Sequence, residues 1–339
     1  MFLHSLLASL GAFALMSNAA LLPLPRTTGN PSDVQTLGQT VYEFENGTWV
    51  ENIAARANGN LLVTLVDRPE LYEISPRKHS ARLVHRFDGY TSLLGISETS
   101  QDVFAVAVGN FSLTRGTTPK TFSIWKVDLS NKQQGKTTHV SKVTDMPDAI
   151  FLNGMTTLQP GSNSILVSDC TQGVVYRVNV ETGKYAIVLR DETFLPTADA
   201  PFPIGINGIR LHGNYLYYSN TPKELFGRIP INTLSGEATG GYKVIHLGFE
   251  VDDFAIRNRA AYAAAGVINE VFRIGPDWES MLVAGAVNST LVEGATSAVF
   301  GRTWSDKDIL YVTTSGGQAS ILDGITTEGG KVVALHIDC

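Results

Sequence analysis

Four polar residues occupy the same place in a repeated sequence pattern, and together they could bind a hard cation. Two are carboxylates and two are carboxamides: Glu51, Asn153, Asn207 and Asp252. Each precedes a run of alternating apolar residues, a polar turn and a β-rich apolar run, so each should open an innermost strand. Oxygen ligands of mixed charge are what Ca²⁺ prefers, and two negative charges would balance the ion. The set predicts a Ca²⁺ site in which Glu51 and Asp252 also serve as catalytic carboxylates.

The same residues have a second, structural interpretation. Asn153 and Asn207 are each followed by glycine, and Asn-Gly is a common turn dipeptide. Polar side chains can also line a water-filled channel without holding an ion. No nucleotide-binding, nucleophile-elbow or C-x-x-C motif is present, and the 7 histidines are dispersed. We therefore expect no organic cofactor.

The pattern that carries these residues occurs six times. The copies begin at positions 51, 94, 153, 207, 252 and 296, so the steps are 43, 59, 54, 45 and 44 residues. Repeats of this length, built from short β-runs, are typical of β-propellers with one four-stranded sheet per repeat. The sequence predicts an all-β, six-bladed β-propeller in which the strand-opening residues converge at one mouth of a central channel.

The last copy has room for only three strands, the third of them Lys331–Ile337. The segment Gln39–Glu45 precedes the first copy and can supply the missing strand. Closure of the ring by this N-terminal strand would remove exposed sheet edges. We expect one propeller domain over residues 39–339, preceded by a lead-in at residues 21–38.

Residues 1–20 form an apolar run that ends in small residues, although no positive charge precedes it. This is typical of a cleaved signal peptide, and a retained anchor is the alternative. Nothing further along is long and apolar enough to span a bilayer, so we expect no stable membrane insertion. The predicted location is the secretory pathway, with the protein secreted or in a vesicle lumen. Three glycosylation sequons fit this route, at Asn46, Asn110 and Asn288.

The chain has two cysteines, Cys170 and Cys339, and an even number of cysteines usually suggests a disulfide. The predicted strand order nevertheless places them at opposite ends of their sheets and about half a ring apart. A disulfide needs Cα atoms within about 7 Å. We therefore predict that the two are not joined within one chain.

The composition of the chain limits the kinds of molecule that it is expected to bind. The chain has 339 residues, 43% hydrophobic and 17% charged, with a net charge of −6 and no basic cluster, which argues against nucleic-acid binding. Residues near the predicted mouth should instead contact a small, largely apolar substrate, whereas the oligomeric state is left open. The predicted substrate contacts are Asp67, Tyr90, Asn110, Asp169, Asn220, Phe226 and Thr296. Tyr90 and Phe226 could stack on a ligand, or could simply pack at the rim.

The four-residue set resembles that of the SMP-30/gluconolactonase/paraoxonase group of six-bladed propellers. The resemblance implies a channel Ca²⁺ held by Glu51, Asn153, Asn207 and Asp252, although Asp253 stands where the group usually has glycine. Longer strings, such as FLNGMTT at 151–157 and GINGIR at 205–210, are similar to a secreted fungal branch. That branch includes hetero-Diels–Alderases of tropolone–sesquiterpenoid biosynthesis.

The resemblance implies a secondary-metabolite cyclase that couples a quinone methide or enone with an alkene in a hetero-Diels–Alder reaction. Holding both partners in a reactive geometry can supply about 7–11 kcal/mol. The alternative is a Ca²⁺-dependent lactone or ester hydrolase, which the oxygen ligand set supports more directly. A secreted binding propeller without enzymatic activity is a third possibility.

Overall fold

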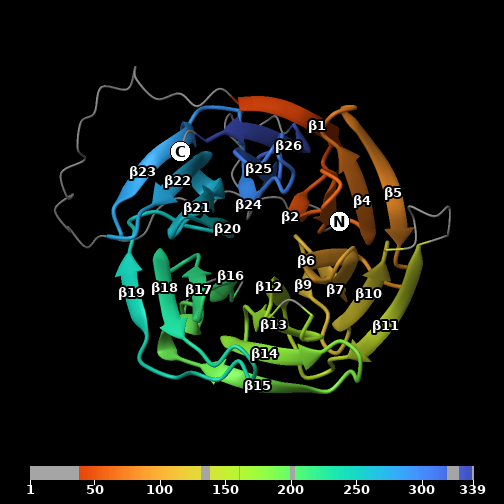
Figure 1. The fold of residues 1–339 in the computed structure, drawn as a ribbon, viewed down its shortest axis with the longest axis vertical. Helices are drawn as coiled ribbons and strands as arrows, with labels where there is room; N and C mark the ends of the chain where they lie inside the picture. The colour runs from red at the N-terminus through yellow and green to blue at the C-terminus, as the bar shows by residue number, and fades with distance from the viewer. Residues whose placement is uncertain (1–37, 131–137, 160, 199–202, 319–327, 338–339) are drawn as a thin grey trace, which may run out of the picture. The chain divides into compact units, whose positions relative to one another are not determined.

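The computed structural model describes residues 38–130, 138–159, 161–198, 203–318 and 328–337. They belong to one unit, Gln35–Cys339, which contains six four-stranded antiparallel sheets in a ring, as Figure 1 shows. The all-β, six-bladed prediction is therefore confirmed. The predicted signal peptide, residues 21–37 of the lead-in and Cys339 lie outside the described residues, so the predictions about them stay predictions.

The first three blades run from inner to outer strand in chain order. Blade one contains β2 (Val50–Ala55), β3 (Leu61–Leu65), β4 (Glu70–Ser75) and β5 (Ser80–Arg86). Blade two contains β6 (Ser92–Ser100), β7 (Val103–Gly109), β10 (Ser123–Asp128) and β11 (His139–Asp145), with a small hairpin of β8 (Phe111–Ser112) and β9 (Gly116–Thr117). Blade three contains β12 (Leu152–Thr157), β13 (Ser164–Asp169), β14 (Val174–Asn179) and β15 (Tyr185–Arg190).

The next two blades repeat this order. Blade four contains β16 (Ile206–His212), β17 (Tyr215–Asn220), β18 (Leu225–Pro230) and β19 (Lys243–His246). Blade five contains β20 (Phe254–Arg257), β21 (Ala260–Ala265), β22 (Glu270–Ile274) and β23 (Ser280–Gly285). Two 3-10 turns, η2 (Glu192–Phe194) and η3 (Gly266–Ile268), lie in loops. In the part of the chain that the structure describes, no helix is long and apolar enough to cross a membrane.

Blade six closes the ring with strands from both ends of the chain. It contains β24 (Ala295–Phe300), β25 (Ile309–Thr314), β26 (Gly329–His336) and β1 (Gly38–Asn46). β1 pairs antiparallel with β26, with Gly38 opposite Leu335, which confirms the predicted closure. Gly329 permits this pairing, because a Cβ atom there would lie 1.8 Å from the Phe44 carbonyl oxygen.

The hydrophobic core lies between neighbouring blades. For example, Leu62 and Leu71 of blade one pack with Phe104, Val106 and Val127 of blade two. Burial of each such side chain contributes about 1.5–3 kcal/mol. The inner strands β2, β6, β12, β16, β20 and β24 contact one another in succession around the ring, and β24 contacts β2. This packing fixes the residues that open those strands near the central axis.

Candidate functional site

The four predicted cation ligands meet at the central axis, and we call them the axial cluster. Asn153 Nδ2 donates hydrogen bonds to Glu51 Oε1 at 3.0 Å and to Asn207 Oδ1 at 2.8 Å. Asn207 Nδ2 donates to Asp252 Oδ1 at 2.6 Å. Glu51 belongs to blade one and Asn153 to blade three, so their contact joins blades that are not neighbours. The cluster therefore brings together side chains from four blades.

Burial disfavours charge on the two carboxyl groups of the cluster. It raises the pKa of Glu51 to about 7, against the opposing effect of hydrogen bonds from Asn153 and Trp49. Burial, followed by the charge of Glu51, raises the pKa of Asp252 well above its usual range. A bound cation would reverse this preference, because an adjacent positive charge stabilises both carboxylates.

The donor set fits a hard divalent cation. Glu51, Asn153 and Asn207 are only 5–6% exposed, so their polar atoms are held away from bulk solvent. A half-turn of the Asn153 amide would point its oxygen toward the cluster, and the Thr221 hydroxyl lies 3.0 Å from Asn207 Nδ2. Among the described residues, no group of three or more His, Cys, Asp or Glu is placed to hold a metal. A cation at the axis would therefore need the amide oxygens.

Two residues beside the axial cluster were not identified from the sequence. Trp49 Nε1 donates to Glu51 Oε2 at 2.6 Å, and Cys170 Sγ lies 3.8 Å from Asn207 Oδ1. Trp49 packs, together with the partly buried Phe111 and Ile204, against the core that contains Cys170. Burial raises the pKa of the Cys170 thiol well above its usual value, which keeps it neutral. Trp49 and Cys170 thus give the cluster an apolar border, which we call the apolar rim.

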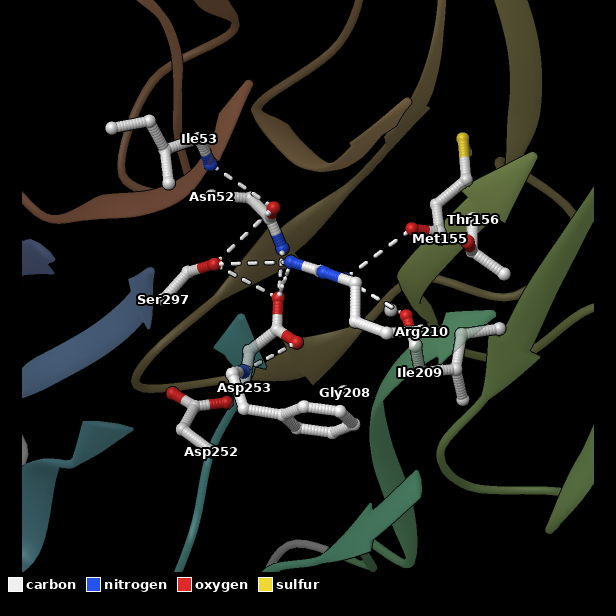
Figure 2. A network of polar contacts seen from close by, with 12 residues as sticks. Asn52, Ile53, Met155, Thr156, Gly208, Ile209, Arg210, Asp252, Asp253 and Ser297 are labelled. Carbon is white, nitrogen blue, oxygen red and sulfur yellow. Dashed lines mark hydrogen bonds and ion pairs between the residues drawn. The ribbon is translucent and has the colours of Figure 1, made fainter. Parts of the chain in front are cut away.

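A second polar network, centred on Asp253, lies beside the axial cluster (Figure 2). Asp253 Oδ2 accepts hydrogen bonds from Arg210 at 2.5 Å, Ser297 at 2.8 Å and Asn52 at 3.2 Å. These partners come from blades four, six and one, and Arg210 also donates to the Met155 carbonyl of blade three at 3.3 Å. Asp253 is 2% exposed, so its carboxylate depends on these contacts. Asp253, which stands where the SMP-30-like group usually has glycine, thus belongs to a hydrogen-bond network that links five blades.

Asp253 also positions its neighbour Asp252. β20 begins only at Phe254, so Asp252 precedes its strand, unlike Glu51, which lies within β2. The Asp252 backbone is held by Ser219 Oγ, which donates to its carbonyl at 2.7 Å, and by Gly208 N at 3.1 Å. Asp253, the next residue, is fixed by the hydrogen bonds of its own side chain. The contacts of the Asp252 backbone and of the Asp253 side chain together position the Asp252 carboxylate.

Comparison with known proteins agrees with the observed fold. No family model matches the chain. Its fold matches that of a calcium-binding protein, regucalcin, from Agrobacterium tumefaciens, with a TM-score of 0.62 and 16% identity over 90% of this chain and 95% of that one. The chain is a six-bladed propeller whose fold is similar to that of regucalcin. Two sequence relatives bear the name "putative hetero-Diels-Alderase". The one from Phoma sp is 28% identical over 90% of this chain and 94% of its own length, and the one from Sarocladium schorii is 27% identical over 81% and 77%.

In this propeller, three of the predicted substrate contacts hold loops in place. Asp67 Oδ1 accepts from the Trp49 backbone N–H at 2.8 Å, in the loop that leads into β2. The fully buried Asp169 accepts from two backbone N–H groups before β12. Asn220 donates to two carbonyls before β16, at 2.7 and 3.0 Å. A polar residue at the end of the second strand, or just after it, therefore anchors the loop that precedes the first strand of the same blade.

Two further predicted contacts are buried in packing. Phe226 is 1% exposed, and its ring lies edge-on to Phe254 at 4.9 Å, so it is not placed to stack on a ligand at the rim. The apolar alternation of β18 turns this side chain into the core between blades four and five. Thr296 is 2% exposed, and its hydroxyl donates to the Val50 carbonyl at 2.6 Å, which links blade six to blade one.

The last two predicted contacts, Tyr90 and Asn110, come together in a surface groove on blade two. The groove has a volume of about 400 Å³ and is also lined by Trp125 of β10 and Lys142 of β11. It does not include any residue of the axial cluster. The other two sequon residues, Asn46 and Asn288, are exposed.

One prediction concerns the Asp253 network. Replacing Arg210 with methionine should lower the free energy of unfolding by about 2–3 kcal/mol, because a buried carboxylate loses its charged partner. The double variant Arg210→Met/Asp253→Asn should recover part of this loss, as measured by urea unfolding. If the effects of the two single substitutions simply add, the pair is not coupled as described.

Proposed function

We propose that this protein is a secondary-metabolite cyclase that catalyses a hetero-Diels–Alder coupling of a quinone methide or enone with an alkene. The observation that carries the proposal is the juxtaposition of the axial cluster with the apolar rim. One side of such a site can face the oxygen of the heterodiene, and the other can face the hydrocarbon. The names of the two relatives support the same reaction class.

The coupling places few chemical demands on the protein. One C–C and one C–O bond form while π bonds are consumed, so every atom of both partners stays in the product. Catalysis then depends on holding the partners together, which can supply about 7–11 kcal/mol. We assign the hydrocarbon contacts to Trp49 of this rim, and to Phe111 and Ile204, which pack against the same core. All three are partly buried and therefore partly accessible.

Polar groups of the cluster would act on the heteroatom. A hydrogen-bond donor aimed at the carbonyl oxygen stabilises the charge that gathers there during the reaction. The protonated form of the Glu51 carboxyl group, which burial favours by raising its pKa to about 7, is such a donor. If the quinone methide arises from an alcohol, water must leave, and a carboxyl group with a pKa near 7 can supply the proton to the departing hydroxyl.

Glu51, Asn153, Asn207 and Asp252 would hold a Ca²⁺ ion, if one is bound. The ion would supply Lewis acidity beside the substrate oxygen. The part of the protein in this arrangement is to orient the ligands: Trp49 fixes the Glu51 carboxylate, and the Asp253 network fixes Asp252.

The axial cluster itself favours a second candidate, a Ca²⁺-dependent lactone or ester hydrolase. Four oxygen-bearing side chains could hold an ion that would polarise a carbonyl, and Glu51 or Asp252 could help to deprotonate water. This activity should disappear when the ion is removed. Turnover of simple lactones and aryl esters, lost with a chelator, would therefore select the hydrolase.

The cyclase is tested by comparing metabolites of the producing organism with and without the gene. We expect the deletion strain to accumulate uncyclised precursors and to lose the coupled product or its optical purity. Restoring the gene should reverse the change, whereas a Glu51→Gln copy should restore it only in part. An unchanged metabolite profile would contradict the proposal.

A further inference from the structure

We propose that Asn110 carries an N-linked glycan whose first sugars lie in the blade-two groove. This proposal rests on passage through the secretory pathway and not on the reaction proposed above. Under this proposal Asn110 is a glycosylation site and not a substrate contact, since an asparagine that carries a glycan does not offer a free amide to substrate.

The Asn110 side chain is oriented for such a modification. Its backbone N–H donates to Thr121 Oγ1 at 3.1 Å, and its carbonyl accepts from the Thr118 N–H at 2.8 Å, so the residue is fixed between β7 and β8. Its Oδ1 is buried and has no hydrogen-bond partner among the described residues, and Asn110 lines the groove. A buried, unpaired carbonyl calls for an explanation, and an orientation set by the modification of the nitrogen supplies one.

The groove has the composition of a sugar site. Tyr90 and Trp125 lie edge-on, with ring centroids 6.0 Å apart, and give an aromatic wall. The Lys142 ammonium lies 5.7 and 5.5 Å from the two ring centroids and pairs with Asp145 at 2.8 Å. Apolar C–H faces of a sugar pack on aromatic rings, while its hydroxyls bond to carboxylate and ammonium groups. Lys120 and Asp88 add further polar groups at the border.

The two other sequons provide internal controls. Asn46, at the end of β1, and Asn288, in the loop after β23, are both exposed. Neither lines the blade-two groove. A glycan on either one would lie outside this groove and should extend into solvent.

The attachment is a group transfer without oxidation or reduction. Asn110 Nδ2 forms a bond to the anomeric carbon of the first N-acetylglucosamine and loses one proton, and the lipid pyrophosphate that carried the sugar leaves. The donor is a lipid-linked oligosaccharide of the secretory pathway. Since attachment takes place on the emerging chain, the later half-burial of Asn110 does not prevent it.

The test uses the full chain secreted from a eukaryotic host. Peptide mapping should find Asn110 occupied. In the folded protein an endoglycosidase should release the Asn110 glycan at least about tenfold more slowly than the glycans on Asn46 or Asn288, because packing in the groove protects it. After unfolding, the three release rates should become equal.

Variants distinguish protection of the glycan by the groove from protection by the folded protein in general. Tyr90→Ala/Trp125→Ala should bring the release rate at Asn110 close to that at Asn46 without changing occupancy, and Asn288→Gln should leave the Asn110 rate unaltered. An unoccupied Asn110, or a glycan there that is released from the folded protein as fast as the one on Asn46, would overturn the proposal. No catalytic activity is measured, so either result leaves the proposed cyclase unaffected.

Discussion

Replacing Glu51 with glutamine, or Asp252 with asparagine, is expected to abolish cation binding at the axis. Each change removes one of the two carboxylates of the axial cluster and leaves the size of the side chain nearly unchanged. At a Ca²⁺ concentration of 100 times the dissociation constant, the wild-type protein should gain about 2.7 kcal/mol of stability, and the variants should gain almost none. Thermal unfolding with Ca²⁺ and with a chelator measures this difference.

A second readout uses Trp49, whose indole bonds directly to Glu51. Terbium bound in place of Ca²⁺ should luminesce when Trp49 is excited, and the signal should be lost in Glu51→Gln. In chelator the Glu51→Gln variant should be at least as stable as the wild type, because burial already disfavours the charged carboxylate. Asp88→Asn, which removes an exposed carboxylate on blade two, is the matched control. Full Ca²⁺ stabilisation of both cluster variants would exclude the axial site.

The second large effect is expected on stability, from Arg56→Ala. Arg56 is 2% exposed and forms ion pairs with Glu73 of blade one and with Asp102, at 2.9 Å, in the turn between β6 and β7. Its guanidinium helps to hold the pKa of Glu73 below its usual value, together with hydrogen bonds from Asn60 and Arg82 and against the effect of burial. Loss of Arg56 would remove the buried cation that the Glu73 and Asp102 carboxylates share, which should cost about 3–5 kcal/mol.

Urea unfolding provides the measurement, and Arg82→Ala provides the comparison. Arg82 also pairs with Glu73, but its side chain is 47% exposed, so its loss should cost about 1 kcal/mol or less. The triple variant Arg56→Ala/Glu73→Gln/Asp102→Asn should recover much of the stability. Equal costs for the Arg56 and Arg82 variants would show that the buried ion pairs do not hold blades one and two together.

The fold could be predicted because each blade repeats the same local sequence pattern. Alternating apolar runs and polar turns recur six times, and the short last copy left a gap that Gln39–Glu45 could fill. The observed β1, Gly38–Asn46, extends that segment by one residue at each end. The axial cluster followed from the same repetition, since equivalent positions of successive blades must converge.

The remaining parts of the site depend on contacts that no repeat encodes. Arg210 and Asp253 are 43 residues apart in sequence, and Asn52 and Asp253 are 201 apart, so no local sequence pattern predicts that they pair. Asp169 and Asn220 have the expected polar character at the expected place. They satisfy backbone groups of their own loops instead of facing a ligand, because a fixed loop needs those hydrogen bonds.

The central claim is that this propeller controls a hetero-Diels–Alder coupling. The most direct test is to generate a quinone methide in situ with a trisubstituted alkene and to measure the enantiomeric excess of the cycloadduct with and without the purified protein. We expect a racemic adduct without protein, one enantiomer in clear excess with it, and loss of that excess in Trp49→Ala, which removes the aromatic part of the apolar rim. A racemic adduct at an unchanged rate, together with chelator-sensitive hydrolysis of simple lactones by the same preparation, would contradict the cyclase and assign the axial cluster to hydrolysis.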